Sequence, residues 1–133
     1  PYVLRSIANC RDDLPEEPAK GLEIGDGVAG RAYKTKSAIV FDPSSGENQA
    51  GTYLPFQGWP PHAFLISIPM MLGEPHLPTY GVLNIGTFCE RDGRLLACLA
   101  SRERMDDLVE AAGVVLKELM EKAKIGKEFS NGY

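Results

Sequence analysis

Cysteine is scarce in this 133-residue chain, and the three that occur, Cys10, Cys89 and Cys98, follow no paired spacing. Zinc sites need cysteines and histidines at short, repeated spacings, and small secreted scaffolds need a dense, even set of cysteines. The sequence therefore predicts free thiols and no metal site, as is usual in a cytoplasmic protein.

The chain also lacks a concentrated positive charge and a long apolar run. Its 14 basic residues are scattered among 18 acidic ones, for a net charge of -4. A nucleic-acid surface needs a basic stripe that neutralises phosphates, and a membrane-spanning helix needs about 20 apolar residues in succession. We therefore expect neither nucleic acid nor membrane among the partners.

Two apolar runs, residues 62–72 and 80–88, are the strongest pattern that is present. They are joined by a short connection rich in proline and glycine, which is typical of a hairpin loop. The apolar positions that share one face of the first run are Phe64, Ile66, Ile68 and Met70. The opposite face is less apolar, with Ser67 in the first run and Asn84 in the second. The runs predict an antiparallel hairpin at the centre of a sheet.

Weaker patterns flank this hairpin. The remaining expected elements are a strand at 2–9, a helix at 28–34, a strand at 37–42 and an amphipathic helix at 103–124. Asp26 is available as the N-cap of the first helix, and Gly126 is available to end the last one, followed by a frayed tail at 127–133. Residues 89–93 (CERDG) are expected to turn the chain, and residues 94–101 fit either a short helix or an irregular segment.

The glycines at 25, 27 and 30 have the GxGxxG spacing of dinucleotide-binding loops. That fold needs a buried strand before the glycines and a full crossover helix after them. The next apolar run begins at Ala38, which leaves room for one or two helical turns only. The spacing therefore favours a glycine turn that leads into a short helix.

Residues 43–61 (PSSGENQAGTYLPFQGWPP) have no sustained period, yet they contain Tyr53, Phe56 and Trp59. A long aperiodic loop in a small domain is often functional. One interpretation is a lid over a small-molecule pocket, and the other is that the aromatic rings close the edge of the core. His62 follows directly, either as a ligand contact or as an ordinary residue at the start of a strand.

In order and spacing, four segments resemble a GAF domain, a small-molecule-sensing module related to PAS domains. They are LEIGDGVAGRA from residue 22, AIVFD from 38, SIPM from 67 and GVLNI from 81. The resemblance implies an α+β fold in residues 1–126. A central antiparallel sheet would carry helices, including the long C-terminal one, on one face. The other face would hold a ligand cavity roofed by residues 43–61.

One departure concerns the N-terminal side. GAF domains usually begin with a helix and a further central strand, and neither precedes Tyr2 in this sequence. Either an upstream part is missing or a second chain completes the sheet, because an unpaired central edge invites strand addition. This favours a homodimer.

Enzymatic and chromophore-binding GAF relatives fit less well. The relatives that reduce free methionine sulfoxide carry a cysteine in the glycine turn, where this chain has Ala29. Bilin-binding relatives attach the chromophore through a cysteine beside a histidine, and no such pair occurs. The Asn-Lys pair typical of cyclic-nucleotide binders is replaced by Thr87 and Phe88, which leaves that ligand unsupported.

The prediction is a regulatory domain without catalytic activity or an identified cofactor. It binds a small-molecule effector and passes the change through its terminal helix to an output domain or signalling partner. The candidate ligand-binding residues are Arg31, Asp42, Tyr53, Phe56, Trp59, His62, Ser67, Val82 and Asn84. The alternatives are a ligand-free dimerisation module and, with its cysteines misplaced, a methionine sulfoxide reductase.

Overall fold

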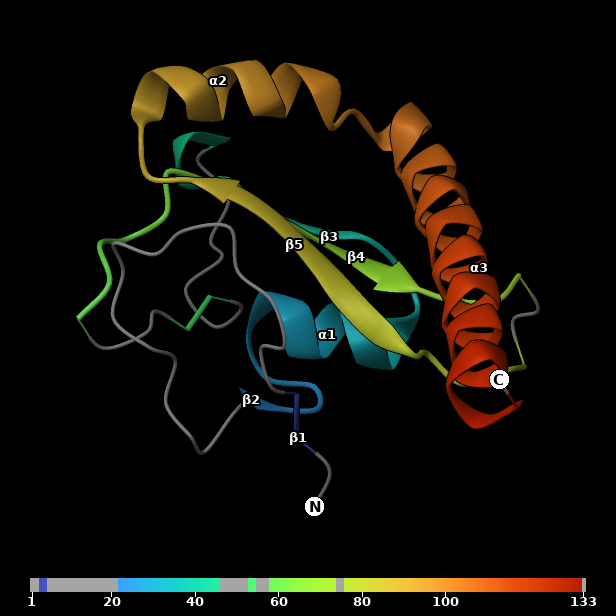
Figure 1. Ribbon diagram of the computed structural model, residues 1–133. Coiled ribbons are helices and arrows are strands. Elements are labelled where there is room, and N and C mark those ends of the chain that lie inside the picture. Colours follow the sequence, from blue (N-terminus) through green and yellow to red (C-terminus); the bar gives the residue numbers. More distant parts are fainter. Residues whose placement is uncertain (1–2, 5–21, 46–52, 55–57, 74–75, 133) are drawn as a thin grey trace.

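The centre of the fold is a three-stranded antiparallel sheet with the strand order β3-β4-β5. The computed structural model describes residues 3–4, 22–45, 53–54, 58–73 and 76–132 (Figure 1). Strands β4 (Phe64–Met70) and β5 (Gly81–Thr87) form the predicted hairpin, and β3 (Ile39–Phe41) pairs with the other edge of β4. The α+β class and the hairpin are thus confirmed.

One face of β4 forms the hydrophobic core. Phe64, Ile66 and Ile68 are buried there, as their period of two predicts, and they cluster with Ala112. The layer above them consists of helices α2 (Glu90–Leu99) and α3 (Arg102–Gly132). Burying each of these large side chains stabilises the fold by about 1.5–3 kcal/mol before conformational entropy is counted.

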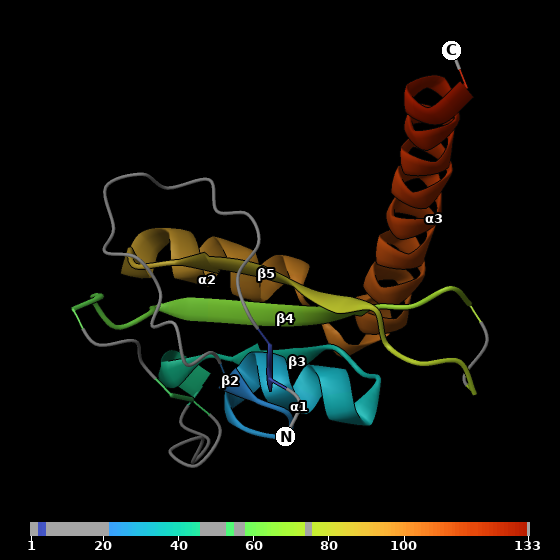
Figure 2. The same ribbon diagram turned by 60° about the horizontal axis from the view of Figure 1, so that its bottom comes forward.

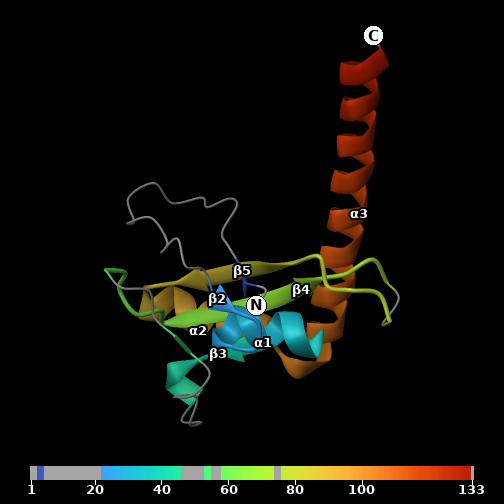
Figure 3. The ribbon, with the colours of Figure 1, turned by 90° about the horizontal axis from the view of Figure 1, so that it is seen from below.

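Helix α1 (Gly27–Thr35) lies against the opposite face of the sheet (Figures 1 and 3). Ser67 and Pro69, which point to this face, are fully buried. The expectation that all helices share one face is therefore wrong. Glycine at 30 lets α1 pack closely against the chain segment that precedes it, since a Cβ atom there would come within 2.6 Å of the carbonyl oxygen of Glu23.

The glycine segment before α1 forms the predicted turn. Gly25 has a φ of 97°, which favours glycine, and its N–H donates to the carbonyl of Gly30 at 3.0 Å. Asp26 occupies the N-cap position with an extended backbone, but its carboxylate makes no capping hydrogen bond. The turn follows a separate two-stranded sheet of β1 (Val3–Leu4) and β2 (Leu22–Glu23). The rest of the strand expected at 2–9 lies outside the described residues.

The C-terminal helices differ from expectation in their bounds. The residues after Cys89, expected to form a turn, begin α2, which also settles the undecided segment 94–101 as mostly helical. Helix α3 continues through Gly126 to Gly132, so the predicted helix end is wrong. A single interior glycine costs about 1 kcal/mol relative to alanine, too little to stop a helix flanked by good helix formers.

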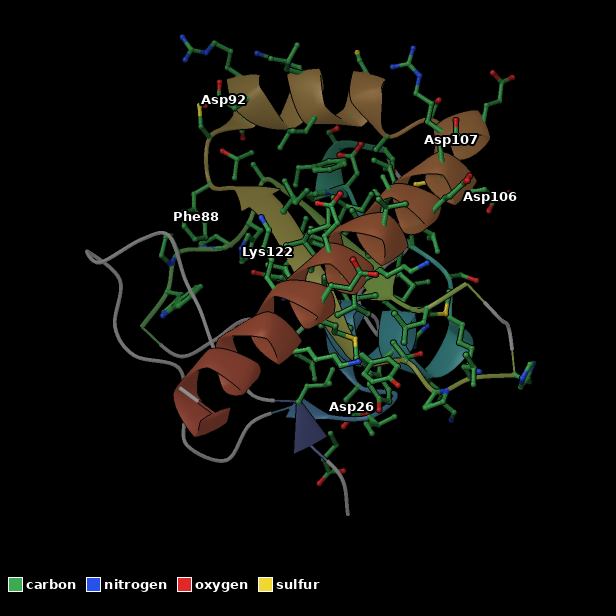
Figure 4. All side chains as sticks on the ribbon, turned by 45° about the vertical axis from the view of Figure 1, so that its right-hand side comes forward. Asp26, Phe88, Asp92, Asp106, Asp107 and Lys122 are labelled. Atoms are coloured by element: carbon green, nitrogen blue, oxygen red, sulfur yellow. The ribbon has the colours of Figure 1, made fainter. Side chains whose placement is uncertain are left out.

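Acidic residues stand in the first turns of α3, which suits its helix dipole, but no basic residue stands in its last turn because the helix continues to Gly132. Figure 4 shows Asp106 and Asp107 near its beginning and Lys122 further along the helix. Beyond the core, α3 extends past the sheet on the side of β5 (Figures 2 and 3). No helix in the described part of the chain combines the length and hydropathy needed to cross a bilayer.

Candidate functional site

Five aromatic rings gather at one end of the sheet. They belong to Phe41, Tyr53, Trp59, His62 and Phe88, a set that we call the aromatic cluster. Because neighbouring strands are antiparallel, β3 ends, β4 begins and β5 ends at the same place. The sheet thereby positions three of the rings, and the segment at 43–61 contributes the other two.

The rings contact one another in a chain. Phe41 and Tyr53 stack with their centroids 4.1 Å apart and their planes 11° from parallel. The ring centroids of Phe88 and His62 are 4.6 Å apart, and those of Phe88 and Trp59 are 6.4 Å apart in an edge-to-face arrangement. Such pairs each contribute about 0.5–1.5 kcal/mol beyond the burial of their area. The cluster therefore ties Tyr53 and Trp59 to the end of the sheet.

His62 is the polar centre of the cluster. Its backbone N–H donates to the hydroxyl oxygen of Tyr53 at 3.1 Å, and the same oxygen lies 2.8 Å from Nδ1 of the imidazole. Burial lowers the pKa of His62 below its usual 6.5, so the ring is neutral near pH 7. We assign the tautomer in which the Tyr53 hydroxyl donates to Nδ1, because the hydroxyl then both donates and accepts a hydrogen bond; the imidazole hydrogen is then on Nε2.

The glycine at position 86 leaves space for this imidazole. A Cβ atom at Gly86 on β5 would come within 3.0 Å of Cδ2 of His62 and within 2.9 Å of the carbonyl oxygen of Phe64. Glycine at this position therefore lets the ring lie against the sheet. The sequence pattern marks Gly86 only as a small residue on the less apolar face.

The predicted polar positions of the hairpin, Ser67 and Asn84, form a pair. They lie opposite each other in the register, and the Ser67 hydroxyl donates to Oδ1 of Asn84 at 2.6 Å. Ser67 is 0% exposed, whereas Asn84 is exposed. A role for Ser67 as a ligand contact is therefore not supported in this conformation, because α1 and the sheet enclose this side chain. Val82 is half-buried two residues before Asn84, opposite Pro69.

The other predicted residues belong to neither of these two groups or lie outside the described residues. Asp42 follows β3, and its carboxylate accepts hydrogen bonds from the backbone N–H and the hydroxyl of Ser44, at 3.0 and 2.6 Å. Asp42 thereby caps the short 3₁₀ helix η1 (Pro43–Ser45), which is a structural role. Arg31 is exposed on α1. Phe56 lies outside the described residues.

Two members of the aromatic cluster, Phe41 and Phe88, are absent from the predicted set. Each stands at the end of an apolar run, Phe41 in 37–42 and Phe88 in 80–88. The antiparallel hairpin, once predicted, already places the end of the second run beside His62. Figure 4 shows Phe88 where β5 leads into α2.

The structure also has a cavity of about 420 Å³, at a different place from the predicted one. It lies between α3, the residues that follow β4 and the connection from α1 to β3. Its lining includes Lys36, Met71, Leu72, Glu110 and Gly113. The predicted cavity under the 43–61 segment stays a prediction, because most of that segment is outside the described residues.

Within the described ranges, no group of three or more histidine, cysteine or acidic side chains is placed to hold a metal ion. Cys89 and Cys98 are free and exposed. Comparison of the chain with family models, curated proteins and solved structures finds no match. The likeness to GAF domains therefore stays a prediction from the sequence.

Proposed function

We propose that this protein is a regulatory binding domain of the GAF type that takes a flat heteroaromatic molecule at the aromatic cluster. The observation that supports this proposal is the meeting of Tyr53, Trp59 and His62 with two further rings at one end of the sheet. Small-molecule sites combine apolar and aromatic walls with a few polar groups that fix orientation. The cluster has both.

The chemistry of the cluster selects the class of ligand. Its rings offer stacking surfaces, and Nε2–H of the neutral His62 offers one directed hydrogen-bond donor. No described group forms a hydrogen bond with Nε2. A ring nitrogen or carbonyl oxygen of a heteroaromatic ligand would accept this hydrogen bond. The exposed amide of Asn84, on the same sheet face as Phe41 by register, is available for a second one.

Strand β4 provides a route from the aromatic cluster to α3. His62 comes just before β4, and Met71 follows directly after it. Seven residues of strand span about 23 Å. At the far end α3 packs so closely that a Cβ atom at Gly113 would lie 2.6 Å from the carbonyl oxygen of Met71. A shift of β4 on ligand binding would therefore change the position of α3 on the sheet. Helix α3 would carry this change to an output partner.

The competing function is a ligand-free interaction module. One observation favours it: Ser67 is fully buried and its hydroxyl is satisfied by Asn84, so this part of the sheet needs no ligand to complete its hydrogen bonds. In that case the aromatic cluster only anchors the 43–61 segment.

Trp59 is the single tryptophan and reports directly on the cluster. We propose to titrate the protein with adenine, riboflavin and nicotinamide, and with cyclohexanecarboxylate as a non-aromatic probe, following Trp59 fluorescence and Tm. At least one heteroaromatic probe should change the fluorescence and raise Tm by mass action, and the cyclohexane acid should do neither.

Two variants locate the binding. His62→Gln should weaken the affinity at least about tenfold, which corresponds to about 1.4 kcal/mol. Tyr80→Phe alters an exposed tyrosine just before β5, at the opposite end from the aromatic cluster, and should leave the affinity unchanged. If no heteroaromatic probe alters either signal of the folded protein, the ligand-free module is the better account.

A further inference from the structure

The outer edge of β5 lacks the charges and prolines that usually protect an edge strand. The strand order places β5 at the end of the sheet, and no strand in the described ranges pairs with its outer side. Its seven residues, GVLNIGT, include neither a charged residue nor a proline. Natural edge strands are usually short, charged, kinked by a bulge or interrupted by proline, because a bare edge recruits other strands. This edge is therefore suited to pairing.

The side chains beside the edge are also apolar and accessible. Leu83 is 43% exposed and Ile85 is 41% exposed, on the face that carries the hydrophobic core. A strand added next to β5 would cover both and would extend the core sideways. The same strand would satisfy the outward backbone groups of β5.

The sequence of β5 is complementary to itself. In an antiparallel pair of β5 strands centred on Asn84, Leu83 lies opposite the partner subunit's Ile85, and Val82 lies opposite the partner subunit's Gly86. Apolar residues meet apolar or small ones on both faces, and no like charges meet. A two-fold interface requires this reciprocity, in which each residue finds its counterpart in the second copy.

Helix α3 is much longer than the three-stranded sheet is wide. Its 31 residues span about 46 Å at 1.5 Å per residue, whereas three strands about 4.8 Å apart span about 10 Å. Figures 2 and 3 show the helix running past β5 on the side where a further strand would lie. Among the side chains that the structure describes, the exposed large apolar ones in this part of the helix are Val114, Val115, Leu119 and Met120.

We propose that a second copy of this chain occupies the edge, with the two β5 strands paired antiparallel about a two-fold axis at Asn84. The two three-stranded sheets then form one continuous sheet, and the exposed apolar side chains of each α3 lie over the partner's strands. The pairing needs no ligand, so its test is independent of the proposed sensing function.

Sedimentation equilibrium of the full chain without ligand tests the pairing. The unaltered protein should be a dimer, and Leu83→Lys should raise the dissociation constant at least about tenfold. Leu95→Lys is the matched control, because Leu95 is 64% exposed on α2 and should leave the dissociation constant unchanged. Circular dichroism checks that both variants are folded. A monomer at every concentration overturns the proposal.

Cross-linking tests the register. In a chain with Cys10, Cys89 and Cys98 changed to serine, Asn84→Cys should form a disulfide-linked dimer on oxidation. Leu83→Cys should not, because the two Cα atoms would be about 8 Å apart, beyond the reach of a disulfide. Equal cross-linking of both variants, or of neither, overturns the pairing about Asn84.

Discussion

At the scale of single residues, His62 joins the two properties that a ligand site needs. Its ring is packed among aromatic neighbours, and its Nδ1 is held by the hydroxyl of Tyr53. In the assigned tautomer the other nitrogen is a donor without any charge on the ring. A protonated imidazole in the same place would lose hydration that the surrounding rings do not replace.

The stability of the protein should therefore fall on mild acidification. Burial lowers the pKa of His62 in the folded state below 6.5, so the unfolded chain binds more protons in the interval between the two pKa values. The contribution of His62 to stability is present above pH 6.5 and is lost as the pH falls towards the folded pKa. Urea unfolding between about pH 8 and about pH 5 measures this loss.

Two variants test whether His62 causes this loss of stability. His62→Gln should flatten this part of the profile, whereas His76→Gln, an exposed residue in the β4–β5 connection, should retain it because His62 is still present. A profile that His62→Gln leaves unchanged would mean that the imidazole is not desolvated as described.

The pairing of Ser67 with Asn84 is a residue-scale feature that can be predicted from the sequence. Once the two runs form a hairpin, alternation puts both side chains on one face, and the register sets them opposite each other. The burial of Ser67 could not be predicted in the same way. It depends on where α1 docks, and α1 has small inner residues that carry no directional signal.

At the scale of elements, hydrophobic periodicity and turn residues were sufficient to predict a helix or strand where the pattern was long or strongly alternating. The hairpin of β4 and β5 and the greater part of α3 follow from periodicity alone. Helix α2 was ambiguous because Gly93 stands in its first turns. Gly93 is buried there, and a Cβ atom would lie 3.2 Å from the carbonyl oxygen of Ala63. Tertiary packing, not helix propensity, explains this glycine.

Helix α3 should behave as two parts of unequal importance for folding. Leu108 packs against the core, whereas Leu119 is 55% exposed. Leu108→Ala should lower the free energy of unfolding by about 2 kcal/mol, and Leu119→Ala by less than about 0.5 kcal/mol. Both are measured by urea unfolding in the Leu83→Lys background, which removes the proposed pairing. Equal losses would show that the outer part of α3 is packed within its own chain.

At the scale of the whole molecule, the arrangement of layers was only partly predictable. The apolar stripe of α3 and the apolar face of β4 must both be buried from water, so the sequence predicts that they pack together, as they do. The position of α1 on the opposite face has no such signal. The aperiodic 43–61 segment offers no periodicity from which its path could be predicted, although its aromatic residues indicate that it folds back. Tyr53 and Trp59 do so at the aromatic cluster.

The contact between Gly113 and Met71 decides how the helical layer is fixed to the sheet. Alanine at 113 would favour an isolated helix by about 1 kcal/mol. In the folded chain its Cβ would lie 2.6 Å from a backbone carbonyl oxygen, which cannot move without shifting the end of β4. Gly113→Ala should therefore lower the free energy of unfolding by about 1–3 kcal/mol in urea.

Gly81→Ala is the matched control, because a Cβ atom there meets nothing within 4 Å. It should change stability by less than about 0.5 kcal/mol. A stabilised Gly113→Ala protein would mean that α3 does not rest on Met71. The proposed route from the aromatic cluster along β4 would then end before it reached the helix, even if a heteroaromatic ligand bound as expected.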